Sequence, residues 1–428
     1  MMFKKNWLVL AFLLVLAILP VGAAAAESQI ERTTVSGMTI LLEQTPSEVV
    51  EIALLLKSGS GLDPAGRKGA AQIMNNLVML RLNYGGSGKG LGDVAVETQP
   101  DYTLIRIRTT AAKAGDALNE IKALLSYPLY SYDVIADLKK LYAVDLKALP
   151  ALTKSYYEFN REFYGADHAY NNELVPEALA KVSGTDVYQW YRRTYQPGNA
   201  LLSISGGYDK SLAEVEKLFA NLRTEPVDHR LFIDPVVIPK TRRLDRVDPN
   251  GRVTSVTIGF SGPRLQDPEF PAFRIIAYYL EEYQHYFQEL RVKQALFYTS
   301  QVMYDYLEKP KAPAIVFVTM TDRESLPKVE AETLRIIREL ATEGIPQAEI
   351  GKVVAAIRAE MEARRKDGKG LALRNLLSFY LESRLVYDDQ LLPRLERVTT
   401  AEIQKAAAKY LQNYIRVAYI PEQPAENF

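Results

Sequence analysis

The chain has 428 residues, of which 48% are hydrophobic, so it can form one very large domain or two to three ordinary domains with packed cores. Lysine plus arginine equals aspartate plus glutamate at 52 each, which argues against a general nucleic-acid-binding protein, because such proteins carry an excess of positive charge. The sequence contains no cysteine, which excludes disulfides, thiolate nucleophiles and cysteine-ligated zinc.

The first residues have the pattern of a secretory signal. Lys4 and Lys5 precede an uncharged apolar run over Trp7–Leu19, and three alanines before Glu27 offer a small-residue cleavage site. The run is short for a membrane span, although an uncleaved anchor is the alternative. The sequence therefore predicts a signal peptide over residues 1–26, export to the periplasm or the exterior, and no stable membrane span after cleavage.

Alternating apolar residues then predict a series of strands. They indicate a hairpin over Ile30–Leu42 that turns at Ser36-Gly37, and a further strand over Val50–Leu56. A helix over Gly69–Leu82 follows, and more extended structure is expected between Asp93 and Thr110. The remaining elements expected in the first half are helices over Ala114–Leu125 and Ser131–Leu149, a helix capped near Ser183, and a strand over Ala200–Ser205.

The helix over Gly69–Leu82 carries three amides within about one turn. Gln72, Asn75 and Asn76 share one face, because positions i, i+3 and i+4 are neighbours on a helix. A zinc site on a helix uses the same spacing, with two ligands one turn apart and a carboxylate beside them. From these residues alone, the helix carries either a site that has lost its metal or no site at all.

Residues 224–250 are rich in proline and charge and predict a linker between domains over 27–223 and 251–428. The order of elements then repeats, and five positions recur at a constant offset, which indicates duplicated domains of the α+β class. The paired positions are Leu179 and Leu395, Val182 and Val398, Asp186 and Glu402, Val187 and Ile403, and Leu201 and Val417. The expected elements of the second half are a strand over Val253–Phe260, a helix near Phe270–Leu290, a strand over Pro313–Thr321, and helices over Pro327–Glu343 and Pro346–Arg365.

Two candidate sites lie in the second half. Glu281, Glu282 and His285 could form a one-turn metal pair, but no second pair completes it. Arg291 and Tyr298 lie between the predicted helix and the next strand, and a guanidinium and a phenol can donate to peptide carbonyls or to a developing oxyanion. On the residues alone, a surface arginine and a part-buried tyrosine are the simpler interpretation.

The mature chain resembles the insulinase/pitrilysin-type metallopeptidases in their short two-domain form. The resemblance rests on the stretches Tyr164–Tyr170 (YGADHAY), Tyr195–Asn199 (YQPGN) and Phe287–Arg291 (FQELR) with Tyr298, in the family's order and spacing. It implies two homologous α+β domains, each with an antiparallel-rich sheet and helices on one side, facing each other across a cavity like a clam shell.

The resemblance also implies a degenerate metal site. The family carries His-x-x-Glu-His, in which the histidines bind zinc and the glutamate activates water. Here Gln72 and Asn76 stand at the histidine positions, Asn75 stands at the glutamate position, and the downstream glutamate position falls near Asp145. Amides are poor zinc ligands and Asn75 cannot act as a general base, so we expect no bound metal or other cofactor and no catalytic residue in this chain.

By the same resemblance, we expect a non-catalytic subunit that forms a heterodimer with a zinc-bearing paralogue and presents Arg291 and Tyr298 to a peptide or unfolded protein. The edge strand between Asp93 and Thr110 could pair with that substrate by strand addition, although Ala95-Val96 stand where the family usually has Asn-Ala. Two alternatives remain open: a stand-alone peptide-binding or chaperone-like protein, and a structural subunit of an envelope assembly.

Overall fold

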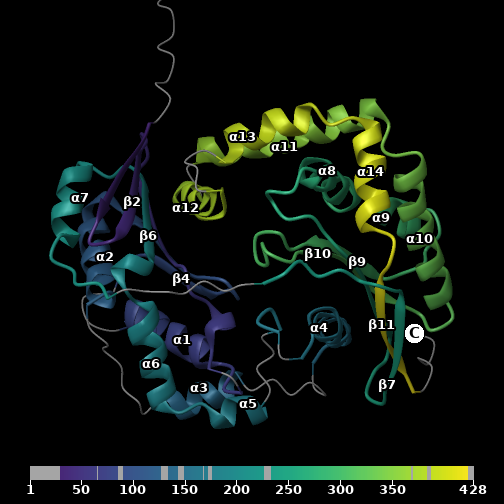
Figure 1. The fold of residues 1–428 in the computed structure, drawn as a ribbon, viewed down its shortest axis with the longest axis horizontal. Helices are drawn as coiled ribbons and strands as arrows, with labels where there is room; N and C mark the ends of the chain where they lie inside the picture. The colour runs from purple at the N-terminus through teal and green to yellow at the C-terminus, as the bar shows by residue number, and fades with distance from the viewer. Residues whose placement is uncertain are drawn as a thin grey trace, which may run out of the picture.

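The computed structural model describes residues 29–64, 66–84, 90–126, 134–142, 149–166, 168–171, 176–225, 233–367, 370–382 and 387–422. The predicted signal peptide, Asp145 and residues 226–232 of the predicted linker lie outside these ranges. None of the helices within them is long and apolar enough to cross a membrane. The described chain forms two β-sheets with helices packed against both (Figure 1).

The first sheet has the strand order β1-β2-β6-β3-β5-β4. Its neighbouring strands are antiparallel, except that β2 and β6 run parallel. The predicted hairpin is confirmed, and its turn residues Ser36 and Gly37 have φ angles of 51° and 83°, the left-handed conformation that tight hairpin turns require. The strands are β1 (Ile30–Val35), β2 (Met38–Gln44), β3 (Val49–Leu56), β4 (Asp93–Thr98), β5 (Thr103–Thr110) and β6 (Ala200–Gly206).

The second sheet has the order β7-β11-β8-β10-β9, and β7 and β11 run parallel. It repeats the order β2-β6-β3-β5-β4 of the first sheet. The helices that precede β6 and β11 begin with equivalent capping boxes, Ser183 with Asp186 and Thr399 with Glu402, so the predicted duplication is confirmed. The strands are β7 (Arg242–Asp248), β8 (Thr254–Ser261), β9 (Thr299–Tyr304), β10 (Ala314–Thr321) and β11 (Ile415–Pro421).

Two expectations for local structure were wrong. Arg242–Asp248, predicted as linker, form β7, whose mostly exposed charged residues give no apolar alternation. The predicted helix near Phe270–Leu290 breaks after Leu280, and Gln284 within the break adopts a left-handed conformation with φ 57°. The helices of the second half are α8 (Phe270–Leu280), α9 (His285–Phe287), α10 (Leu326–Thr342), α11 (Gln347–Asp367), α13 (Tyr387–Glu396) and α14 (Thr400–Tyr410), with a π-helical turn over Gln288–Val292.

Most helices of the first half cover one face of the first sheet. Ile73 and Val78 of the first helix and Ile121 of the second pack into one core with strand residues such as Ile52 and Ile105. These helices are α1 (Ala70–Tyr84), α2 (Ala111–Leu124), α3 (Ile135–Tyr142), α5 (Pro176–Lys181), α6 (Gly184–Thr194) and α7 (Leu212–Phe219).

Two helices are exchanged between the halves. Helix α4 (Ala151–Tyr164) belongs to the first half in sequence but packs on β8, β11 and β10, whereas α12 (Leu371–Glu382) packs on β6, β3 and β2. In Figure 1, α4 lies beside the second sheet and α12 beside the first. The exchange carries buried polar contacts as well as apolar ones: Lys154 pairs with Asp248 at 3.0 Å, and Asn375 donates to Glu43 at 2.6 Å. Each half therefore completes the packing of the other.

Candidate functional site

Helix α1 is held at its start by a carboxylate. Asp63 accepts hydrogen bonds from the backbone N–H groups of Gly69 at 2.6 Å and Ala71 at 2.8 Å, which satisfies donors that a helix N-terminus leaves unpaired. Burial raises the pKa of Asp63 to about 7, against the lowering effect of these two hydrogen bonds. The strand–turn–helix predicted around the three amides is confirmed, and Asp63 is a capping residue that the sequence analysis missed.

Asn75 is a fully engaged buried amide, with 1% of its surface exposed. Its Nδ2 atom donates to Thr98 Oγ1 at 2.8 Å and to Thr103 Oγ1 at 3.0 Å. Its Oδ1 atom accepts the phenol of Tyr195 at 2.8 Å. These contacts join α1 to β4, β5 and the residue that follows α6, so the side chain at this position connects four parts of the fold.

The other two amides flank Asn75. Gln72 is half-buried, and Asn76 is buried and donates to the carbonyl of Gln72 at 2.8 Å. The described part of the chain contains no group of three or more histidine, cysteine, aspartate or glutamate residues that could hold a metal ion. Since Asp145 lies outside that part, the fourth predicted position is not placed, and the interpretation of Gln72, Asn75 and Asn76 as a degenerate site stays a prediction.

Arg291 lies in an unusual backbone segment. It belongs to the π-helical turn over Gln288–Val292, and the non-glycine residues Gln284 and Ala295 on either side have φ angles of 57° and 53°. A left-handed L-residue costs about 1–2 kcal/mol, and π-turns occur frequently at functional sites. The fold therefore holds this segment in a conformation that its residues do not favour by themselves.

The side chains of Arg291 and Tyr298 differ in their partners. Arg291 is half-buried, and its side chain has no hydrogen bond or ion pair with another described residue. Tyr298 is 53% exposed and donates its phenol hydrogen to Asp322 Oδ1 at 2.5 Å. That hydrogen bond is the main cause that raises the pKa of Tyr298, while the nearby Arg291 lowers it. The structure thus places a charge of Arg291 near enough to act on Tyr298 and gives Tyr298 a partner, Asp322, which the sequence analysis missed.

The residues of the third candidate have other partners. Glu281 accepts the backbone N–H of Val302 at 2.6 Å, and His285 stacks on Tyr279 with ring centroids 4.4 Å apart. Burial lowers the pKa of His285. Glu281 therefore ties α8 to β9, and the two residues do not converge with a further ligand within the described ranges.

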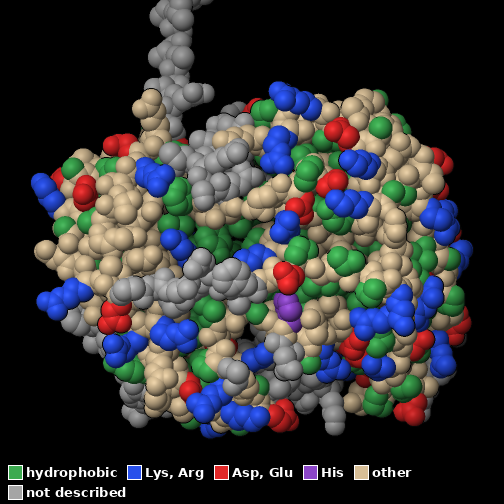
Figure 2. All heavy atoms as spheres, in the orientation of Figure 1, with side chains coloured by type: hydrophobic (Ala, Val, Ile, Leu, Met, Phe, Trp, Pro, Cys, Tyr) green, Lys and Arg blue, Asp and Glu red, His purple; other side chains and the backbone are tan. Residues whose placement is uncertain are grey.

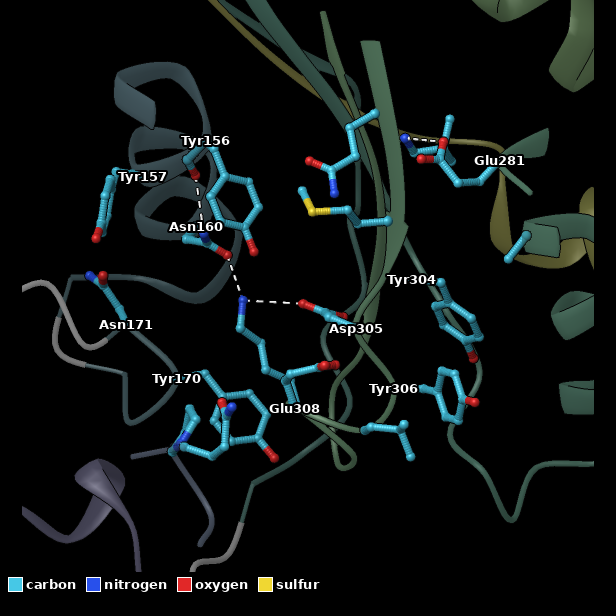
Figure 3. Close-up of a pocket in the computed structure, with 18 of the residues that line it drawn as sticks. Tyr156, Tyr157, Asn160, Tyr170, Asn171, Glu281, Tyr304, Asp305, Tyr306 and Glu308 are labelled. Atoms are coloured by element: carbon cyan, nitrogen blue, oxygen red, sulfur yellow. Dashed lines mark hydrogen bonds and ion pairs between the residues drawn. The ribbon is translucent and has the colours of Figure 1, made fainter. Parts of the chain in front are cut away.

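A cavity of about 840 Å³ opens between the halves, bounded by α4, the end of α8, β9 and the loop after it (Figure 3). Lys309 lines the cavity, where it forms an ion pair with Asp305 at 3.1 Å and donates a hydrogen bond to Asn160 at 2.7 Å. Tyrosines dominate the aromatic lining, and the carboxylates of three glutamates also line it. These residues are Tyr156, Tyr157, Tyr170, Tyr304, Tyr306, Glu281, Glu282 and Glu308.

The wall of this cavity also joins the halves. Asp101, in the turn between β4 and β5, accepts the phenol of Tyr170 and pairs with Lys311 of the loop between β9 and β10. The Asp101 side chain is fully buried. On the face shown in Figure 2, positive and negative side chains are intermixed, as the balanced charge of the sequence predicts.

Residues 181–357, which include Arg291 and Tyr298, match the family model of the peptidase M16 inactive domain. A search of curated proteins finds no match. The fold is shared with a protease from Helicobacter pylori (TM-score 0.79, 17% identity, 92% of this chain and 100% of that chain) and with a peptidase M16 inactive domain from Pseudomonas fluorescens (0.78, 19%, 93% and 100%).

The periplasmic protease PqqL from Escherichia coli is also similar, with a TM-score of 0.71 and 14% identity over 97% of this chain and 49% of that chain. This chain therefore corresponds in fold to about half of PqqL. At these identities the likenesses show the fold, and they confirm the predicted α+β class with two sheets.

Proposed function

We propose that this chain, a member of the insulinase (M16) peptidase family with the family's inactive domain in residues 181–357, is a non-catalytic, substrate-binding subunit of an exported zinc protease. It pairs with a zinc-bearing paralogue, encloses peptides, and supplies Arg291 and Tyr298 to them. The zinc and the general base belong to the partner chain.

The observation that carries this proposal is the contrast between Asn75 and Arg291. Asn75, which the resemblance assigns to the position of the family's general base, uses its Oδ1 atom and both Nδ2 hydrogens in internal hydrogen bonds. Arg291, in contrast, has no side-chain partner among the described residues and lies in a strained segment. A guanidinium with five donors and no internal acceptor is suited to a ligand that presents carbonyl oxygens, as a peptide main chain does.

The edge strand β4 supports the peptide-binding half of the proposal. It is the last strand of the first sheet, and most of its residues are half-buried. Within the described chain, β4 pairs on one side only, with β5. An extended peptide can add to such an edge through main-chain hydrogen bonds, which gives affinity with little dependence on sequence.

The experiment is co-purification of the tagged chain with a paralogue that carries an intact His-x-x-Glu-His, followed by peptide-binding measurements on the pair. We expect a complex that binds unfolded peptides, with binding weakened at least tenfold in Arg291→Ala, a loss of about 1.4 kcal/mol. Lys293→Ala is the matched control, since Lys293 lies two residues away and pairs with Glu289. Equal peptide binding by the two variants would show that Arg291 does not contact the peptide.

The cavity between the halves favours a second candidate, a stand-alone peptide-binding protein. Its volume lies in the range of small-molecule sites, and tyrosines and glutamates line it. Peptide binding by the isolated chain at the affinity of the complex, with no stable partner recovered, would support this alternative over the subunit proposal.

A further inference from the structure

The hydrogen bond between Tyr298 and Asp322 determines what the phenol can offer a ligand. A phenol has a single hydrogen to donate, and its oxygen also accepts. In this structure the hydrogen points to Asp322 Oδ1 at 2.5 Å, and an ionised carboxylate is a stronger acceptor than a neutral carbonyl. The phenol oxygen of Tyr298 can still accept a hydrogen bond from a ligand, whereas its hydrogen is already donated to Asp322.

We propose that Asp322 is a positioning residue that takes the phenolic hydrogen of Tyr298, so that Tyr298 accepts a hydrogen bond from a peptide N–H while Arg291 donates to a peptide carbonyl. The inference rests on the proposed function, in which both residues contact a peptide. It differs from the sequence-based expectation that both residues act as donors.

The backbone places these groups independently of any ligand. Tyr298 directly precedes β9, and its N–H donates to the carbonyl of Met320 on β10 at 2.8 Å. Asp322 is the first residue after β10, so the pairing of the two strands brings its carboxylate to the phenol. Arg291 is close enough to lower the pKa of Tyr298. The positive charge of Arg291 therefore acts on the phenol of Tyr298, which lies directly before β9.

This arrangement defines a class of substrate. Every peptide unit in an extended chain offers one N–H and one C=O, and a donor–acceptor pair binds both without reading a side chain. A segment with proline or an N-methylated residue at the contacting position lacks the N–H and would bind weakly. The carboxylates of Asp322 and Glu324, which raise the pKa of Tyr298, would also disfavour acidic residues there.

The first arm of the test uses the free chain and needs no peptide. We would label the tyrosine rings with ¹³C and follow the titration of Tyr298 by NMR in the wild type, Asp322→Asn and Glu324→Gln. We expect Asp322→Asn to lower the Tyr298 pKa clearly more than Glu324→Gln, which removes a neighbouring charge but leaves the hydrogen bond in place. Equal shifts in the two variants would overturn the positioning role.

The second arm uses a bound unfolded peptide and analogues in which one amide N–H is replaced by an ester oxygen. We expect one ester position to weaken binding to the wild type about three- to tenfold, as the loss of one hydrogen bond predicts. The same ester should cost little further in Tyr298→Phe, because the phenol oxygen is then absent. Ester and Tyr298→Phe losses that simply add would overturn the acceptor role.

The two arms separate the inference from the proposed function. If no peptide binds the wild-type complex, the proposed function fails and the acceptor role fails with it. If peptides bind but the Tyr298 pKa does not respond selectively to Asp322→Asn, the inference alone is wrong.

Discussion

Tyr195 donates its phenol hydrogen to Asn75 Oδ1 at 2.8 Å, and both residues are almost fully buried. Tyr195 comes from the end of α6 and Asn75 from the middle of α1. The Asn75 side chain thereby holds two helices together. Substitutions at this position should consequently affect stability.

We expect Asn75→Asp to lower the free energy of unfolding at pH 7 by about 2 kcal/mol or more. The change removes the two Nδ2 hydrogens, and Thr103 cannot donate to the new carboxylate because its hydroxyl already donates to the carbonyl of Ser58 at 3.0 Å. Urea denaturation measures the loss. Gln72→Glu, on the same helix but half-buried, should cost much less, and equal losses would contradict the structural role of Asn75.

Ala295→Gly should stabilise the chain by about 1 kcal/mol, because Ala295 has a φ of 53° that glycine adopts without strain. The matched control is Ala355→Gly at an exposed position within α11, which should destabilise by about 1 kcal/mol. Thermal unfolding of both variants measures whether each one is more or less stable than the wild type. Destabilisation by both would show that the left-handed residue carries no strain.

The carboxylate of Asp101 should stabilise the interface between the two halves. Asp101→Asn removes the charge that pairs with Lys311, and we expect about 2 kcal/mol of destabilisation, less than a fully buried pair because Lys311 is partly exposed. Hydrogen exchange of residues 305–313 should accelerate in this variant. Glu97→Gln, which breaks an exposed pair with Arg106, should leave both measurements nearly unchanged.

Asp63 makes stability depend on pH. The pKa of Asp63 in the folded chain is raised to about 7 from a usual value near 4. The stabilisation that Asp63 adds to the folded state is therefore complete below pH 4 and is lost as the pH rises through 7. Compared with Asp63→Asn, the wild type should therefore lose stability between pH 4 and 7. Urea denaturation across this range tests the sign, and parallel pH profiles for the two proteins would contradict it.

Most of the strands and the cap at Ser183 could be predicted from the sequence, because each depends on residues close together in the chain, and the duplication was indicated by positions that recur at a constant offset. Helix α4 was missed because its buried face includes Lys154 and Glu158, and Lys154 is satisfied by Asp248 of the other half. Strand β7 was missed for a related reason, since Arg243 and Arg246 pair with Glu330 and Glu158. A local hydrophobic pattern cannot reveal partners that folding supplies from far along the chain.

The sequence could identify candidate residues for the site but not the contacts that these residues make. Gln72, Asn75 and Asn76 follow from helical spacing, and Arg291 with Tyr298 from a matching stretch. The partners Thr98, Thr103 and Tyr195 become neighbours of Asn75 only through the sheet and α6. Asp322 similarly reaches Tyr298 only through the pairing of β9 with β10.

The absence of bound zinc in this chain is a prediction that a metal assay tests. We expect the isolated chain, after dialysis against zinc and then buffer, to retain much less than one zinc per chain, because the resemblance assigns the amides Gln72, Asn75 and Asn76 to the positions of the family's metal-binding motif, and amides are poor zinc ligands. Stoichiometric, tightly held zinc would contradict the non-catalytic assignment.

The most direct test of the central claim is peptide cleavage by the reconstituted pair of this chain and a zinc-bearing paralogue. We predict that Arg291→Ala combined with Tyr298→Phe in this chain lowers kcat/KM at least tenfold while the complex and its zinc content remain intact, and that Lys293→Ala changes neither. Cleavage that proceeds at the wild-type rate with the double variant would contradict the account.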